Sequence, residues 1–132
     1  MKKFILATFV CLILATNIAN ASREFKDDEG FSYMLNSNYL VYGFGNKACS
    51  VYDLGSIQVR TNNNSCFEFN VTAFTIQYND DSISSKSVVT IREDYSTGNI
   101  YQDDRLLEGQ AINCKKTLRE IYYKMKSVAL NR

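Results

Sequence analysis

The sequence predicts an α+β domain in which a curved antiparallel sheet of about five to seven strands carries one C-terminal helix packed on it. Two observations support this fold class. From residue 31 to residue 107, short aromatic and β-branched runs alternate with Gly, Asn and Asp, which is typical of strands joined by tight turns. Over residues 111–130 the apolar spacing becomes helical.

The N-terminus has the three parts of a secretory signal peptide. Lys2 and Lys3 precede an apolar run at 4–15, and Ala19 and Ala21 form a small-x-small cleavage motif. The apolar run is too short for a membrane helix, which needs roughly 20 residues. We therefore expect a signal peptide at 1–21, cleavage after Ala21, no membrane span in the mature chain, and a secreted or periplasmic location.

The mature chain has the size and charge of one ordinary domain. Removing 21 of 132 residues leaves 111, which we divide into a flexible, charged leader at 22–30 and a single domain at 31–132. The removed segment holds two of the fifteen basic residues and none of the acidic ones, so the mature net charge is 13 − 14 = −1. A charge near zero gives no electrostatic case for nucleic acid or an anionic membrane as partner.

The first half of the domain predicts several short strands and turns. Gly43, Gly45 and Asn46 indicate a turn, Gly55-Ser56 an interruption, and residues 61–65 a polar loop. The predicted strands are Phe31–Leu35, Tyr39–Phe44, Cys49–Leu54 and Ile57–Arg60.

The segment 66–78 is the strongest strand pattern in the chain. Its apolar side chains alternate with polar ones up to Ala73, and the apolar set then moves by one position to begin at Phe74. A one-residue shift turns a strand over, so we expect a β-bulge or a sharp bend at Ala73-Phe74 if the same face stays buried.

Residues 86–95 predict the next strand, followed by an acid-rich hairpin and a strand at Ile100–Leu107. Pairing Tyr95 with Ile100 across a four-residue turn places Arg92 opposite Asp103, which predicts a cross-strand ion pair. Gly98 or Asn99 is expected to supply the positive φ of the turn.

The C-terminal helix predicted within 111–130 has a buried stripe and a basic outer side. Its basic residues are not interleaved with aromatic ones on the outer side, which favours a solvated face over a binding patch. The stripe consists of Cys114, Leu118, Ile121, Tyr122, Met125, Val128 and Ala129.

Three cysteines remain after cleavage. Cys49, Cys66 and Cys114 are the disulfide candidates of an exported chain, and they allow either one bridge with one thiol left over or three free thiols. Their spacing matches no CxxC motif, and the chain has no His for a mixed zinc site, so we expect no metal site.

The absence of His also removes Ser-His and Cys-His nucleophile pairs. A pair of carboxylates such as Glu93 and Asp104 is the remaining catalytic option. Acids on an exposed hairpin lack the apolar burial that raises a pKa, and we therefore predict no catalytic residues and no cofactor.

Two short motifs resemble the small exported bacterial proteins grouped around surface-adhesin protein E. They are an Asp-x-x-Ser-Ile step at Asp53–Ile57 and an acidic strand end before a Gly-Asn turn at Asp94–Asn99, within a similar order of strands and a C-terminal helix over about 31–128. The resemblance implies an antiparallel sheet backed by a helix, exposed at the cell envelope, with adhesion as the role of characterised members. The Asp-Cys pair of many members is absent, so their disulfide does not carry over.

We therefore expect an exported, non-enzymatic binding module whose partner is a protein of a host surface or of the cell envelope. The ligand and its binding residues are not indicated by the sequence. A secreted or periplasmic inhibitor or immunity-type protein is the alternative, followed by a small hydrolase that uses carboxylates alone.

Overall fold

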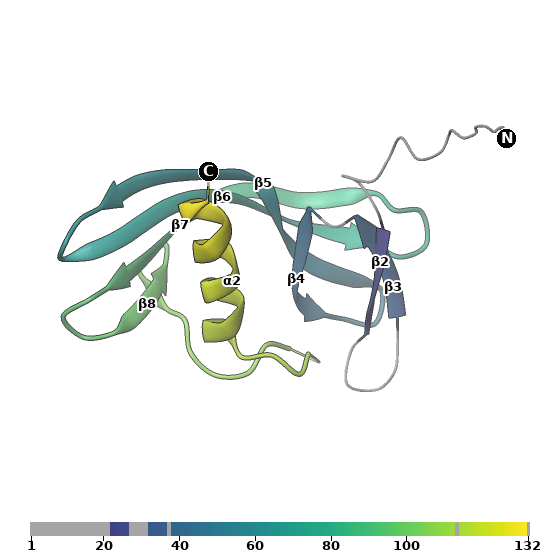
Figure 1. Ribbon diagram of the computed structural model, residues 1–132. Coiled ribbons are helices and arrows are strands. Elements are labelled where there is room, and N and C mark those ends of the chain that lie inside the picture. The colour runs from purple at the N-terminus through teal and green to yellow at the C-terminus, as the bar shows by residue number, and fades with distance from the viewer. Residues whose placement is uncertain (1–21, 27–31, 37, 113, 132) are drawn as a thin grey trace, which may run out of the picture.

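The computed structural model describes residues 22–26, 32–36, 38–112 and 114–131 (Figure 1). These residues form a curled, six-stranded antiparallel sheet, a separate two-stranded sheet and one C-terminal helix, so the predicted α+β fold class is confirmed. The expected signal peptide, including Ala19 and Ala21, lies outside the described residues.

The large sheet is a meander in which every strand pairs antiparallel with the next one along the chain. Such short connections follow from the turn residues between the runs. Its strands are β4 (Tyr39–Phe44), β5 (Ala48–Asn62), β6 (Cys66–Gln77), β7 (Ile83–Asp94), β8 (Asn99–Gln102) and β9 (Arg105–Leu106).

The small sheet pairs β2 (Ser22–Lys26) with β3 (Ser32–Asn36). The strand β3 lies one residue later than the strand predicted at Phe31–Leu35. The segment expected as a flexible leader thus contributes β2, while its residues 27–30 lie outside the described part of the chain.

The two strands predicted on either side of Gly55 are one strand, β5, with an irregularity between them. Its register to β6 shifts between Asp53 and Gln58. The Asp53 carboxylate accepts the Gly55 N–H at 3.0 Å, and the Ser56 hydroxyl donates to the Asp53 carbonyl at 2.7 Å while accepting the Thr72 N–H at 2.8 Å. These bonds satisfy the backbone where the ladder is broken, so the Asp-x-x-Ser-Ile step has a structural role.

The irregularity predicted at Ala73-Phe74 is present, but the extra residue belongs to the neighbouring strand. The register of β6 to β7 shifts between Ala73 and Thr75, where β7 has a residue with positive φ, Ser85 (53°). The register to β5 is uninterrupted there, so Ala73 and Phe74 point to opposite faces of the sheet, and both are buried. Strand β6 is therefore buried on both faces at this point.

The strand predicted at Ile100–Leu107 is a hairpin. Strands β8 and β9 are joined by Asp103 and Asp104, whose φ values of 48° and 68° are those of a turn with two left-handed residues. This combination is required by type I′ turns, which fit the twist of two-residue hairpins.

The helix α2 (Leu118–Leu130) begins seven residues later than the start of the predicted segment. Thr117 is its N-cap: the hydroxyl accepts the Glu120 N–H at 3.1 Å, and the Glu120 carboxylate accepts the Thr117 N–H at 3.3 Å. This capping box fixes the helix start and leaves the buried Cys114 in the preceding loop.

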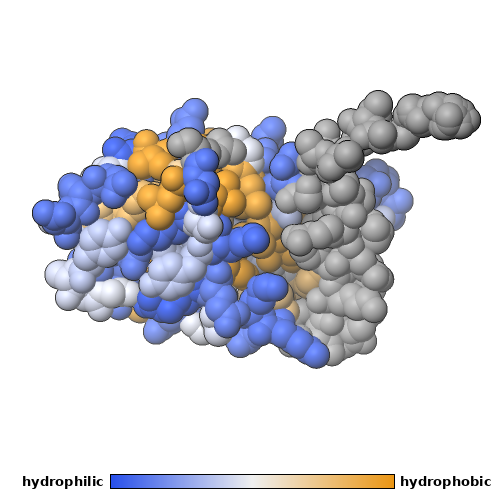
Figure 2. Space-filling view, in the orientation of Figure 1, coloured by the Kyte–Doolittle hydropathy of each residue, from blue (hydrophilic) through white to orange (hydrophobic). Residues whose placement is uncertain are grey.

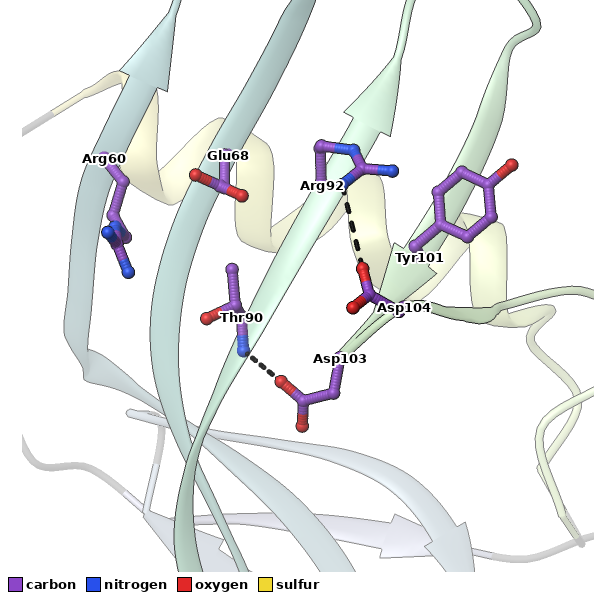
Figure 3. Close-up of a pocket in the computed structure, with 7 residues that line it drawn as sticks. All are labelled: Arg60, Glu68, Thr90, Arg92, Tyr101, Asp103 and Asp104. Carbon is purple, nitrogen blue, oxygen red and sulfur yellow. Dashed lines mark hydrogen bonds and ion pairs between the residues drawn. The ribbon is translucent and has the colours of Figure 1, made fainter.

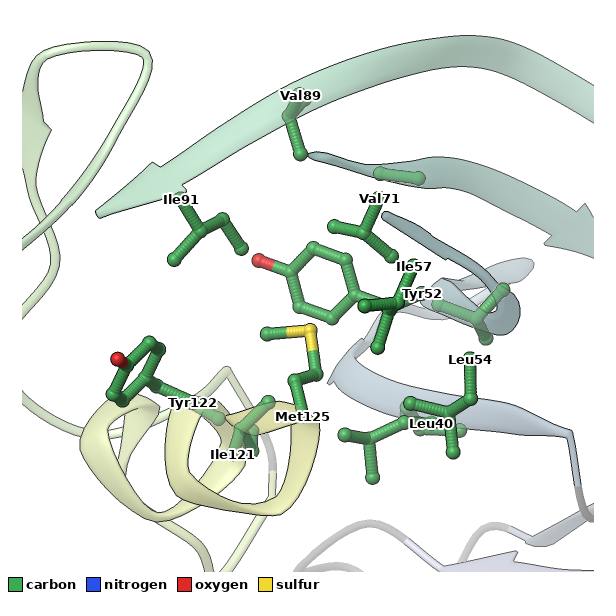
Figure 4. Packing of buried hydrophobic residues seen from close by; sticks show 14 of the residues in the cluster. Leu40, Tyr52, Leu54, Ile57, Val71, Val89, Ile91, Ile121, Tyr122 and Met125 are labelled. Atoms are coloured by element: carbon green, nitrogen blue, oxygen red, sulfur yellow. The ribbon is translucent and has the colours of Figure 1, made fainter. Parts of the chain in front are cut away.

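The core lies between α2 and the concave side of the sheet (Figure 4). Ile121, Tyr122 and Met125 of α2 point toward apolar side chains of the strands and are each no more than 1% exposed. The facing residues from β4 to β7 include Leu40, Tyr52, Leu54, Ile57, Val71, Val89 and Ile91. Burial of this apolar stripe stabilises α2 on the sheet and leaves the other face of β6, β7 and β8 uncovered by the helix.

Candidate functional site

A polar hollow of about 370 Å³ lies on the face of the sheet that points away from α2. Figure 3 looks onto this face, with α2 behind the strands. Charged side chains of both signs line the hollow together with one aromatic ring. The lining residues are Arg60, Glu68, Thr90, Arg92, Tyr101, Asp103 and Asp104.

Strand register places three of these side chains in one row. Glu68 of β6 pairs with Arg92 of β7, and Arg92 pairs with Tyr101 of β8. Directly paired residues of neighbouring strands project from the same face and contact each other. Glu68 and Arg92 both alternate with buried apolar residues of their own strands, which places them on the outer face of the sheet.

Arg92 interacts with Tyr101 and Asp104, on the side away from Glu68. Its guanidinium carbon lies 5.0 Å from the centre of the Tyr101 ring, a cation–π distance, and Nη1 lies 3.9 Å from the Asp104 carboxylate. The Glu68 carboxylate accepts the Thr61 hydroxyl at 3.4 Å. Glu68 and Arg60 form no ion pair with any described residue, so the hollow presents one carboxylate and one guanidinium that are available to a partner.

The predicted Arg92–Asp103 ion pair is wrong because the hairpin register differs from the predicted one. Asp94 pairs with Asn99, which places the four-residue loop at 95–98, one position earlier than predicted. Asp103 then lies beside Thr90: its carboxylate accepts the Thr90 N–H at 2.9 Å, and its own N–H donates to the Thr90 carbonyl at 2.9 Å. Gly98 supplies the positive φ, 75°, as one of the two predicted candidates.

The expectation that the hairpin acids are exposed is wrong for Glu93, which is 7% exposed on the α2 side of the sheet. Its Oε1 accepts the Tyr122 hydroxyl and the Lys126 ammonium, each at 2.8 Å, and its Oε2 accepts the Tyr123 hydroxyl at 3.2 Å. Lys126 also donates to the Tyr95 hydroxyl at 3.1 Å. This network joins the β7–β8 hairpin to α2.

The same contacts set the titration of the network. Burial disfavours the charged carboxylate, but hydrogen bonds from Lys126, Tyr122 and Tyr123 outweigh it and lower the pKa of Glu93. Burial also opposes the charge of Lys126, yet its bonds to Glu93 and Tyr95 raise the pKa of Lys126. Glu93 is therefore an ionised partner of Lys126 at neutral pH.

The carboxylate pair considered for hydrolysis is not brought together. Glu93 is bound to α2 on the buried side, whereas the side chain of Asp104 is 93% exposed beside Arg92 on the opposite face. A glycosidase pair needs both carboxyl groups on one substrate, about 5–10 Å apart. These two residues do not meet that requirement.

Cys49, Cys66 and Cys114 are free thiols in the structure, as in one of the two alternatives left open by the sequence. Cys49 and Cys114 are buried, and Cys66 is half-buried. Burial raises the pKa of Cys49 to about 11, which keeps that thiol protonated and unreactive.

Within the described residues, no three Cys, Asp or Glu side chains gather closely enough to hold a metal ion. No helix in this part of the chain is long and apolar enough to cross a membrane.

Comparison with known proteins gives no relative: no family model matches the chain, and neither the curated proteins nor the solved structures contain a match.

Sequence reasoning missed two residues of the hollow and the Glu93 network. The sequence predicts Arg60 only as the end of a strand, and the predicted hairpin register places Asp103, not Tyr101, opposite Arg92. A signal for Glu93 was available, because it continues the alternation of the buried Val89 and Ile91.

Proposed function

We propose that this chain is an exported, non-enzymatic binding module that engages a protein partner through the polar hollow on the outer face of its sheet. The observation that supports this most is the Arg92–Tyr101 stack, flanked by Glu68 and Arg60, which lack ion-pair partners among the described residues. Arg and Tyr dominate the binding energy of protein interfaces because each combines a large contact area with directed hydrogen bonding.

The N-terminal signal pattern supports export, and the resemblance to the protein E group supports an adhesin-like role at a bacterial envelope. The mixed charges of the hollow favour a partner that carries both positive and negative charges over a polyanion, since Glu68, Asp103 and Asp104 repel phosphates.

The test captures partners of the mature chain, residues 22–132, from envelope and host-cell extracts, identifies them by mass spectrometry and measures the affinity of the purified partner. We expect Arg92→Ala and Tyr101→Ala each to weaken that affinity about tenfold, a loss of about 1.4 kcal/mol. Lys47→Ala, in the turn between β4 and β5, is the control and should leave the affinity unchanged.

A partner whose affinity is the same for all three variants would contradict the proposed site. A single enzyme that is bound tightly and loses its activity would identify the inhibitor or immunity-type variant of this proposal.

A further inference from the structure

A second surface, on the opposite side of the molecule from the hollow, exposes two tyrosines. Tyr95 of the β7–β8 loop is 40% exposed, and Tyr123 of α2 is 42% exposed. Together with Arg119 and Lys126 they form what we call the tyrosine patch. Figure 2 shows this side, where hydrophilic and intermediate side chains mingle over α2 and the hairpin.

Both rings of the tyrosine patch are held in place before any partner arrives. The Tyr123 hydroxyl donates to the buried Glu93 and accepts from Arg119 at 3.1 Å, while the Tyr95 hydroxyl accepts from Lys126. Lys126 lies 4.9 Å from the Tyr95 ring centre, and the Arg119 guanidinium lies 5.9 Å from that of Tyr123. A fixed aromatic side chain loses little conformational entropy when it enters an interface.

The outer side of the helix was expected to be a plain solvated face because aromatic residues do not interleave with its basic ones. The structure differs from this expectation in one respect, because two exposed tyrosine rings lie beside basic side chains of the helix. Tyr123 lies off the buried stripe, beside Arg119, and the hairpin adds Tyr95 through Lys126. Aromatic and basic side chains therefore alternate across the patch.

Charge is segregated toward the C-terminal segment that contains α2. Residues 114–132 contain six basic residues and one acidic residue, a net charge of +5, whereas residues 22–113 contain seven basic and thirteen acidic residues, a net charge of −6. Lys115, Lys116 and Lys124 are exposed. A concentrated positive charge on a chain that is nearly neutral overall attracts acidic partners in a defined orientation.

The hydrogen bonds already made by the patch limit what it can recognise. Arg119 donates to the Gly98 carbonyl at 2.6 Å and to Tyr123, and Lys126 donates to Glu93 and Tyr95. Neither side chain offers the open fork with which Arg binds a phosphate. The remaining features are the exposed tyrosine rings of the patch, which suit apolar side chains, and the exposed lysines of the C-terminal segment, which suit carboxylates.

We propose that the tyrosine patch is a second interaction surface that binds an acidic protein segment in which carboxylates alternate with apolar side chains. It acts independently of the hollow, so the chain can hold two partners on opposite faces.

The test measures fluorescence anisotropy of a fluorescein-labelled peptide of alternating Glu and Leu residues with the mature chain. A peptide of alternating Lys and Leu is the reference. We expect the Glu peptide alone to bind, with an affinity that falls as salt increases. Lys124→Glu should weaken binding about tenfold, and Tyr123→Ala should do so in protein shown by its thermal transition to be folded.

Two controls separate the alternatives. Lys47→Glu changes the net charge as much as Lys124→Glu but lies in the β4–β5 turn, and Arg92→Ala removes part of the hollow; both should leave peptide binding within about twofold of the original. Equal losses in Lys47→Glu and Lys124→Glu would overturn the proposal. Absence of Glu-peptide binding, or tighter binding of heparin that Tyr123→Ala does not affect, would overturn it as well.

Discussion

Glu93 is a carboxylate on the apolar side of a sheet, and it is stable there because three donors surround it. Burying an unpaired charge is strongly unfavourable, whereas a carboxylate that accepts bonds from an ammonium and two hydroxyls recovers most of that loss. The same bonds make folding depend on pH. A folded-state pKa below the ordinary value of 4.5 means that ionised Glu93 stabilises the fold above that value and loses this effect as the pH falls through the lowered pKa.

We predict that Glu93→Gln lowers the free energy of unfolding by about 2 kcal/mol at neutral pH, because it removes charge-assisted hydrogen bonds. The Lys126 side chain is 19% exposed, which moderates the loss relative to a fully buried pair. Urea unfolding at neutral pH and well below pH 4.5 is the measurement, and the difference between variant and parent should shrink in acid. Glu68→Gln, on the outer face, is the control, with a change within about 0.5 kcal/mol. Equal stability of the Glu93 variant and the parent at neutral pH would contradict the role of the network.

For single residues, the sequence predicted which side chains alternate between the buried and the exposed face of a strand, but not which partners they contact. The predicted alternation of apolar and polar side chains up to Ala73 is confirmed by the burial of every second residue. The partners of Glu93 come from α2, 29 to 33 residues further along the chain, and no local pattern encodes such contacts. Local patterns likewise did not predict the burial of the thiols, because that burial depends on packing between distant strands and loops.

At the scale of elements, turn geometry decided where the predictions succeeded. Strand Tyr39–Phe44 was predicted to the residue, since glycines mark its end. The hairpin register was wrong because the Asp94 side chain accepts the Ser96 N–H and hydroxyl and so starts the loop one residue early. The late start of α2 was visible in the sequence as the Thr-x-x-Glu capping box at 117–120.

Two turn positions allow opposite predictions. Asp104 has a φ of 68°, which is unfavourable for a residue with a Cβ, so Asp104→Gly should stabilise the protein by about 0.5 kcal/mol after allowance for the added flexibility of the unfolded chain. Its exposed ion pair with Arg92 contributes little to stability.

Gly98 has a φ of 75° and nothing within 4 Å of an added Cβ, so Gly98→Ala should destabilise the protein by about 1 kcal/mol through backbone conformation alone. Thermal unfolding of both variants measures the sign of each change in stability. Destabilisation by Asp104→Gly would refute the assigned turn.

At the scale of the whole molecule, the meander leaves part of one strand without a neighbour. The ladder between β7 and β8 covers only Ile91–Asp94, and no described strand pairs with the earlier residues of β7 on that side. Residues 83–88 are exposed and include Ile83 and Val88. An open, partly apolar edge favours pairing with other chains. The irregular residue Ser85 and the charge of Lys86 interrupt this edge.

We predict that Lys86→Val increases self-association, because it removes the one charge in the middle of the open edge. Sedimentation velocity over a range of concentrations is the measurement. Lys47→Val makes the same change of charge and apolarity in the β4–β5 turn, and this control variant should keep the oligomeric state of the parent. If the two variants had the same distribution of monomers and oligomers, the open edge of β7 would not be the cause of self-association.

The position of α2 after all the strands determines when the molecule can complete its core. A chain that is made from its N-terminus can form the meander as each hairpin appears, since neighbouring strands are consecutive. Its concave face, with Phe69, Val71 and Ile91 each at 0% exposure in the finished fold, stays open until the residues of α2 arrive. Glu93 likewise meets Tyr122, Tyr123 and Lys126 only at that point. Closure of the core therefore depends on α2, which follows every strand of the sheet along the chain.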